Sequence, residues 1–328
     1  MASWSQARNQ RYLSTDGMSL STITRHGPEI SDAIVSFDPV TLQRKPVRKA
    51  DVLVQFRKLG NHEAARIVEQ MPEHSGILDP EAVDKILITS HCEMQRMSEE
   101  FQHGKRVAEL LKPILNALRD GDVQNPIRIV DIGCGTGFVI RWLAASGSLG
   151  DDVELMGVDF NVALLDEAKR LATIENLRCK FAVANAFRLD EPATVFISTG
   201  ILHHFRDQDL SYLLQQHCRP ETRAFVHFDF HSSPMAPLGS WLFHAVRMRE
   251  PLAKHDGVLS AARAHKSRYL LDVTRSAAPE FVSAIYGTRL WRMPIPRVFH
   301  SLVGIRPEYR EAFIRNMGTR IASLGKIE

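Results

Sequence analysis

The chain has 328 residues, of which 44% are hydrophobic and 24% charged, and its net charge is +3. These values are typical of a globular protein with one α/β domain and appendages, and they exclude three independent cores. No apolar run approaches the roughly 20 residues that a membrane-spanning helix needs. The four cysteines are scattered without a Cys-x-x-Cys pair, so we expect a cytoplasmic protein without a cysteine-based zinc site.

Residues 1–60 show weak organisation, although alternation around the Asp38-Pro39 turn indicates a possible hairpin. Helical periodicity begins at residue 61. Asp79 followed by Pro80 is a favourable helix start, because the Asp side chain caps free N–H groups and proline tolerates the first helical position. We therefore expect a weakly organised segment over 1–60 and a helical extension, or cap, over 61–121.

Residues 122–328 alternate between short β-rich runs and helical segments, which predicts one α/β domain. The expected architecture is a doubly wound, mostly parallel seven-stranded sheet. The helical stretch at about 235–275 would be an insertion after the fifth strand that forms a lid. The expected strands lie at 127–133, 153–160, 179–187, 194–200, 223–230, 281–293 and 297–306.

The strongest signal is the sequence VDIGCGTGF at residues 130–138, between an expected strand and an expected helix. Glycines at alternate positions allow a sharp turn and the close approach of a ligand to the backbone. Asp159 ends the next strand, where a carboxylate can accept hydrogen bonds from both hydroxyls of a ribose. A dinucleotide fingerprint would have a third glycine at position 138, but Phe138 stands there.

This pattern resembles motif I of the class I S-adenosylmethionine-dependent methyltransferases, and the resemblance extends over about residues 127–230. It implies that the glycine turn faces the methionine and ribose of the cofactor, S-adenosyl-L-methionine. Asp159 would hold the ribose and Phe160 would lie against the adenine. The implied cofactor-binding residues are Asp131, Gly133, Gly135, Gly137, Asp159, Phe160, Asn185, Ala186, Phe187, Ser198 and Thr199. A domain that binds another nucleotide is the alternative.

Candidates for the chemistry follow the fourth and fifth strands. His203 and His204 would lie near the transferred methyl group, either as bases or in a structural role. On the fifth strand His227, Asp229 and His231 would share one face, because side chains two apart on a strand point the same way. We take His203, His204, Asp229 and His231 as the catalytic candidates and expect no metal, since such groups more often form hydrogen bonds at strand ends.

The expected function is methyl transfer to a small molecule by direct displacement at the sulfonium. Residues 241–328 contain 15 Lys and Arg against 7 Asp and Glu, which would suit an anionic acceptor, while an aromatic acceptor is equally open. No RNA-binding module is visible, which disfavours nucleic acid. An RNA or protein methyltransferase and a catalytically silent cofactor-binding protein are the alternatives. The sequence leaves the oligomeric state open.

Overall fold

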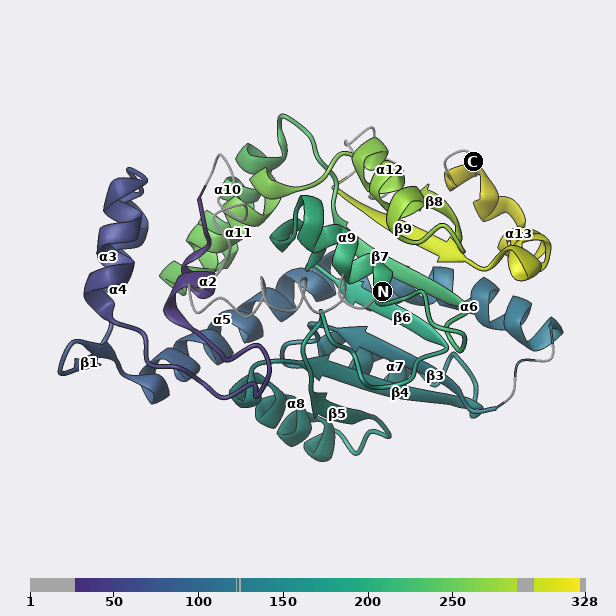
Figure 1. Ribbon diagram of the computed structural model, residues 1–328, viewed down its shortest axis with the longest axis horizontal. Helices are drawn as coiled ribbons and strands as arrows, with labels where there is room; N and C mark the ends of the chain where they lie inside the picture. Colours follow the sequence, from purple (N-terminus) through teal and green to yellow (C-terminus); the bar gives the residue numbers. More distant parts are fainter. Residues whose placement is uncertain (1–26, 122, 124, 288–297, 325–328) are drawn as a thin grey trace, which may run out of the picture.

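The computed structural model describes residues 27–121, 123, 125–287 and 298–324. Its centre is a seven-stranded sheet in the order β5-β4-β3-β6-β7-β9-β8 (Figure 1). The pairs from β5 to β7 are parallel, and β9 pairs antiparallel with both β7 and β8. The strands are β3 (Ile127–Ile132), β4 (Val153–Asp159), β5 (Lys180–Val183), β6 (Val195–Thr199), β7 (Ala224–Phe230), β8 (Val282–Tyr286) and β9 (Phe299–Ile305).

The predicted doubly wound, mostly parallel seven-stranded sheet is confirmed. The last two strands are shorter than predicted, and the part of the prediction that falls on residues 288–297 lies outside the described residues. Helices cover both faces of the sheet: α6, α7 and α13 pack on one core, and α9 and α12 pack on the other. These helices are α6 (His103–Asp120), α7 (Phe138–Ser146), α9 (Asp207–Gln215), α12 (Ser267–Ala277) and α13 (Arg310–Met317).

Helix α6 shows why the sheet is covered in this way. Its residues Val107, Leu111, Ile114 and Leu118 recur at a spacing of three or four, and all four side chains are fully buried. Residues 103–120 therefore pack directly on the sheet, although the sequence placed them in an extension. A break at Gln102, whose φ is +56°, separates α6 from α5 (Pro80–Glu100), and Asp79 caps α5 as expected.

Residues 27–88 contribute to a separate small core, which also contains Leu164 and Leu252 from the main domain. The described part of the segment expected to be weakly organised is thus folded, because Ile30, Ile34 and Phe56 are buried. A bridge between Phe37 and Arg44 closes the turn where a hairpin was expected. The elements here are α2 (Ile30–Ile34), α3 (Lys49–Lys58), α4 (His62–Glu69), β1 (Glu73–His74) and β2 (Ile77–Leu78).

The stretch after β7 divides into two parts. Helices α10 (Ala236–Arg247) and α11 (Pro251–Arg263) pack on each other, and α11 contacts α2, α4 and α5 (Figure 1). Helix α12 instead packs on α9 and β8, so the last third of the expected lid belongs to the cover of the sheet.

The remaining elements are the helix α8 (Val162–Ile174) and the 3-10 turns η2 (Leu202–His204), η3 (Pro307–Tyr309) and η4 (Gly318–Ser323). None of the described helices combines the length and apolarity required to cross a bilayer.

Candidate functional site

Strands β3, β4, β6 and β7 run parallel, so their carboxyl ends meet along one edge of the sheet. β3 is flanked by β4 on one side and β6 on the other, which makes its end the point where the strand order reverses. Open α/β sheets bind ligands at this position. Acidic side chains stand at or near three of the strand ends: Asp131 on β3, Asp159 on β4 and Asp229 on β7.

The turn after β3 requires its glycines. Gly133, Gly135 and Gly137 have φ values of +66°, +54° and +73°, in the left-handed region that side chains with a Cβ rarely adopt. A Cβ on Gly133 would stand 2.7 Å from a methyl group of Ile201, and one on Gly135 would stand 2.6 Å from Cδ2 of His91. The backbone of this turn is therefore packed so closely that only glycine fits.

The Asp159 carboxylate ties the glycine turn to the start of α8. Its Oδ2 accepts a hydrogen bond from the Gly135 N–H at 2.9 Å, and its Oδ1 accepts one from the Asn161 N–H at 2.9 Å. Burial raises the pKa of Asp159, and these two backbone donors oppose that rise. The His91 ring, whose Nδ1 donates to the Leu87 carbonyl, lies across the same turn.

Asp131 is the second acidic group beside this turn. Its side chain is buried, and its Oδ1 has no hydrogen-bond partner within the described part of the chain. Burial, and after it the charge of Asp159, raise the pKa of Asp131 well above its usual value. An unsatisfied buried acceptor of this kind is costly unless a donor on a ligand or on water completes it.

The expected adenine side is partly covered by the N-terminal segment. The Phe37 ring meets the Phe160 ring edge-on with centroids 5.0 Å apart. The Asn185 side chain donates to the Pro39 carbonyl at 3.0 Å and accepts from the Phe187 N–H at 2.9 Å. Its carboxamide oxygen thus already has one protein partner, and only the second lone pair remains for a ligand.

Ser198 and Thr199 end β6, but the Ser198 side chain turns into the protein. Its Oγ lies 2.7 Å from Nδ1 of His227, whose Nε2 lies 2.8 Å from Nε2 of His217. Burial lowers the pKa of His227 to about 3. His227 therefore belongs to an internal network, and Ser198 can meet a ligand only through its backbone.

His203 and Asp229 form a buried pair. The His203 Nδ1–H donates to Asp229 Oδ1 at 2.8 Å, and the His203 backbone N–H donates to Oδ2 at 3.0 Å. Burial opposes ionisation of Asp229, but His203 and the backbone N–H of Phe230 hold its pKa below the usual range. Burial lowers the pKa of His203. The imidazole is therefore neutral, and its Nε2 has no hydrogen-bond partner among the described residues.

Four further ionisable groups surround this pair. His204 Nδ1 lies 3.3 Å from Asp32, and the fully buried Arg263 lies 3.2 Å from Glu29 and 3.1 Å from Asp32. Burial raises the pKa of Glu29 to about 7. Burial disfavours a charged His204, but the charges of Glu29 and Asp32 outweigh it and raise the pKa to about 9.

Of the four catalytic candidates, the structure thus brings His203, His204 and Asp229 together. His231 follows β7, and its ring lies against His300 of β9, with the two Nδ1 atoms 3.4 Å apart. Sequence reasoning missed Glu29, Asp32 and His91. No local motif singles out these residues, and only the packing of the N-terminal segment brings Glu29 and Asp32 to the site.

Residues 129–220 match the family model of the methyltransferase domain. Over this stretch the chain is similar to a methyltransferase domain. It is similar to trans-aconitate 2-methyltransferase of Pseudomonas paraeruginosa, with 30% identity over 109 residues, which cover 33% of this chain and 34% of that protein. The corresponding protein of Pseudomonas aeruginosa is 33% identical over 98 residues, covering 29% and 33%. The chain thus spans about a third of the length of the curated relatives that it matches.

Solved structures of methyltransferases are also similar to the chain. The magnesium protoporphyrin IX methyltransferase of Synechocystis with bound S-adenosylhomocysteine has 17% identity and a TM-score of 0.43, covering 79% of this chain and 99% of that one. A plantazolicin methyltransferase has 12% identity and a TM-score of 0.47, covering 68% and 96%. At these TM-scores the similarities carry no weight for substrate or mechanism.

Proposed function

We propose that this protein is an S-adenosylmethionine-dependent methyltransferase that acts on a small-molecule acceptor. The observation that carries the proposal is the methyltransferase-domain match over residues 129–220, which includes both the glycine turn and Asp159. The turn has the left-handed glycines and the close packing described above.

The residues at the turn fit such a cofactor. Asp159 presents a carboxylate at the end of β4 for the ribose, and Asp131 offers an unsatisfied acceptor to a donor on the ligand. The backbone of the glycine turn would contact the methionine moiety, and Phe160 would contact the adenine. The cofactor supplies, when bound, a methyl group activated by a positively charged sulfur. We assign the remaining contacts to Asn185, Ala186, Phe187, Ser198 and Thr199.

The protein's part in the transfer is to place the acceptor and manage its proton. Alignment of the acceptor with the methyl group supplies much of the acceleration, and a base is needed where the acceptor carries a proton of high pKa. Asp229 holds the Nδ1–H of His203. Nε2, which points toward Glu29 at 3.7 Å and has no hydrogen-bond partner among the described residues, is then the ring nitrogen left for the acceptor. We place His204 beside it and assign His231 to the edge of the acceptor site.

Aromatic side chains adjoin His203 on one side. The Phe230 ring lies 5.9 Å from the His203 ring, and Phe299 lies 4.9 Å from Phe230. Phe101 contacts Phe299 and Phe243 of α10. These rings belong to the buried core beside His203. We keep an acceptor with a flat aromatic part as one class, and a small carboxylate as the other, since the curated relatives are named for trans-aconitate. Both acceptor classes are small molecules, and both belong in the first acceptor panel.

The proposal is tested first by a calorimetric titration of the purified, cofactor-free protein with S-adenosylmethionine. One-to-one binding at micromolar affinity is expected. Transfer of labelled methyl groups is then measured with a panel of tricarboxylic acids and phenols, beside RNA and protein acceptors. A folded protein that does not bind the cofactor contradicts the proposal, and transfer only to a macromolecule contradicts the assigned acceptor class.

Asp159→Ala should weaken S-adenosylmethionine binding at least tenfold, which corresponds to about 1.4 kcal/mol. The substitution removes the ribose acceptor and also releases the Gly135 and Asn161 N–H groups that shape the turn. Titration calorimetry measures the change. Asp166→Ala is the matched control, because this carboxylate lies on the exposed face of α8. If both variants bind like the wild type, the ribose assignment is wrong.

A further inference from the structure

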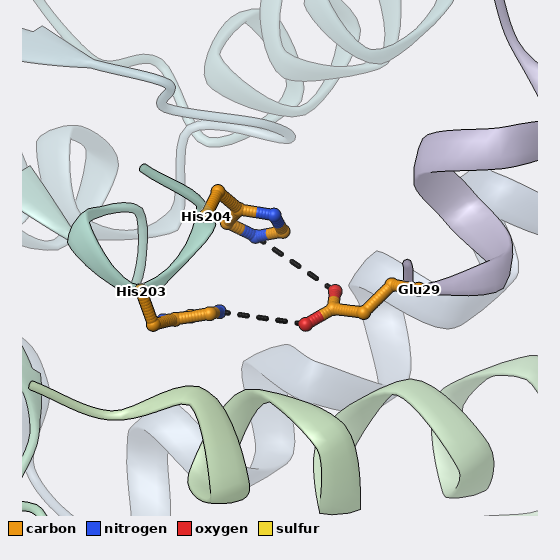
Figure 2. A group of neighbouring side chains, drawn as sticks. All are labelled: Glu29, His203 and His204. Atoms are coloured by element: carbon orange, nitrogen blue, oxygen red, sulfur yellow. Dashed lines mark ion pairs between the residues drawn. The ribbon is translucent and has the colours of Figure 1, made fainter. Parts of the chain in front are cut away.

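Glu29, His203 and His204 come together from two segments far apart in the sequence. One ligand-type atom from each of the three side chains lies within 4.8 Å of the others. Glu29 Oε1 is 3.7 Å from Nε2 of His203, and Glu29 Oε2 is 3.8 Å from Nε2 of His204. Figure 2 shows both imidazole rings pointing toward the carboxylate. The two rings lie side by side, with centroids 4.4 Å apart.

The opposite nitrogen of each imidazole is held by a carboxylate. Asp229 binds Nδ1 of His203 at 2.8 Å, and Asp32 lies 3.3 Å from Nδ1 of His204. Both contacts direct Nε2 toward Glu29. Histidines that bind metals usually have this arrangement, since a carboxylate on the far nitrogen fixes the ring and makes the near nitrogen a better ligand.

The near nitrogens and Glu29 stand too far apart for hydrogen bonds. Separations of 3.7 and 3.8 Å exceed the usual limit for an N–H···O bond. Nε2 of His203 is buried and has no hydrogen-bond partner within the described ranges. A buried, unsatisfied nitrogen aimed at a carboxylate indicates that something belongs between them.

We propose that Glu29, His203 and His204 bind a divalent transition-metal ion of the kind that prefers two imidazoles and one carboxylate, such as Zn²⁺, Co²⁺ or Fe²⁺. This inference goes beyond methyl transfer. With metal–ligand bonds of about 2.0–2.2 Å, neighbouring ligand atoms stand on the order of 3.0–3.5 Å apart. A small movement of the side chains brings these three atoms to that spacing.

The remaining contacts of Glu29 are compatible with this role. Its Oε1 accepts from Ser260 Oγ at 2.9 Å and lies 3.2 Å from Arg263. These two groups orient the carboxylate and leave Oε2 directed at His204. Three protein ligands leave at least one position of the ion open. The His204 side chain is 27% exposed, whereas Glu29 and His203 are buried, so the open position is reached from the His204 side.

A hydroxyl group of a small molecule would bind to the ion at the open position through its oxygen. The ion would then lower the pKa of that hydroxyl group. His203 would then be a ligand of the ion, and the ion would take over the activation that we otherwise assign to the free imidazole. The sequence alone led us to expect no metal, since polar groups of this kind more often form hydrogen bonds at strand ends. Glu29 was not among the candidates, because no ligand motif surrounds it.

The test is a titration of the untagged, chelator-treated protein with Co²⁺, followed by its visible absorption and by the bound metal per chain. The wild type should bind one Co²⁺ per chain, and Zn²⁺ should displace it. Glu29→Gln keeps the shape of the side chain but lowers ligand strength, so it should weaken binding at least tenfold. Asp32→Asn, which acts through His204, should weaken binding by about 10–100-fold.

His74→Ala is the control, since this exposed histidine could bind Co²⁺ only non-specifically. It should bind Co²⁺ like the wild type. The proposal is overturned if the wild type takes up no stoichiometric Co²⁺ or Zn²⁺, or if Glu29→Gln and Asp32→Asn bind as tightly as the control. Calorimetry with S-adenosylmethionine on the same samples keeps the two questions apart, because intact cofactor binding without metal refutes only the metal site.

Discussion

Asp229→Asn should reduce turnover by about a hundredfold while leaving S-adenosylmethionine affinity unchanged. In the wild type Asp229 accepts from both the Nδ1–H and the backbone N–H of His203. An asparagine amide in its place can donate to Nδ1, which moves the ring proton to Nε2. The nitrogen that faces the acceptor would then be a donor in most molecules, and only the minor tautomer could take up a proton or bind a cation there.

The pH profile separates this effect from a general loss of structure. Burial lowers the pKa of His203, and the negative charge of Asp229 works against that decrease. Removing the charge therefore lowers the pKa further. If neutral His203 acts as the base, the acidic limb of the kcat/KM profile moves to lower pH in the variant. A merely structural defect would reduce the rate without moving the limb.

The measurement uses the acceptor identified from the panel, with Asp272→Asn as the matched control. Asp272 lies half exposed on α12, so its replacement should change neither turnover nor the pH profile. Asp229→Asn turning over like this control would show that the His203–Asp229 pair has no part in the reaction.

The glycine turn and Asp159 could be predicted because their signals are local. A β-rich run, alternating glycines and a helix follow one another within 20 residues at 127–146, and each local preference agrees with the fold. The alternation of strands and helices could also be predicted, since the parallel strands β3, β4, β6 and β7 are short apolar runs separated by helices.

The cluster of side chains around His203 could be predicted only in part. His203, His204 and Asp229 follow strands of the same sheet, so their proximity follows from the topology. Glu29 and Asp32 reach them from the N-terminal segment through the small core formed by Ile30, Ile34 and α11. Sequence periodicity does not encode a contact across more than 200 residues, such as Asp256 accepting from the Ile30 N–H.

A second failure has a different cause. The sequence predicted a helical extension over 61–121, and this range includes α6. Periodicity reveals that a helix has an apolar face, but it does not reveal which surface covers that face. Similarly, the sequence predicted that most of α12 belongs to a lid. In the structure its Leu270 and Thr274 are buried, and the helix packs on α9 and β8.

Arg263→Met should lower the free energy of unfolding by about 3 kcal/mol or more. Arg263 is fully buried and lies between Glu29 and Asp32. Methionine fills much of the same volume but leaves both carboxylates with His204 as their remaining nearby cation. Urea unfolding measures the change, and Arg268→Met, at a side chain 93% exposed, should alter stability by no more than about 0.5 kcal/mol.

The double variant Arg263→Met/Glu29→Gln identifies the cause of that loss. If the cost comes from an uncompensated buried charge, removing the Glu29 charge restores part of the stability that Arg263→Met alone takes away. If the two losses simply add, the cost comes from packing around α11. Stability equal to the wild type in Arg263→Met would mean that the ion pairs do not hold the N-terminal segment in place. Glu29 and Asp32 would then reach the histidines through the small apolar core alone.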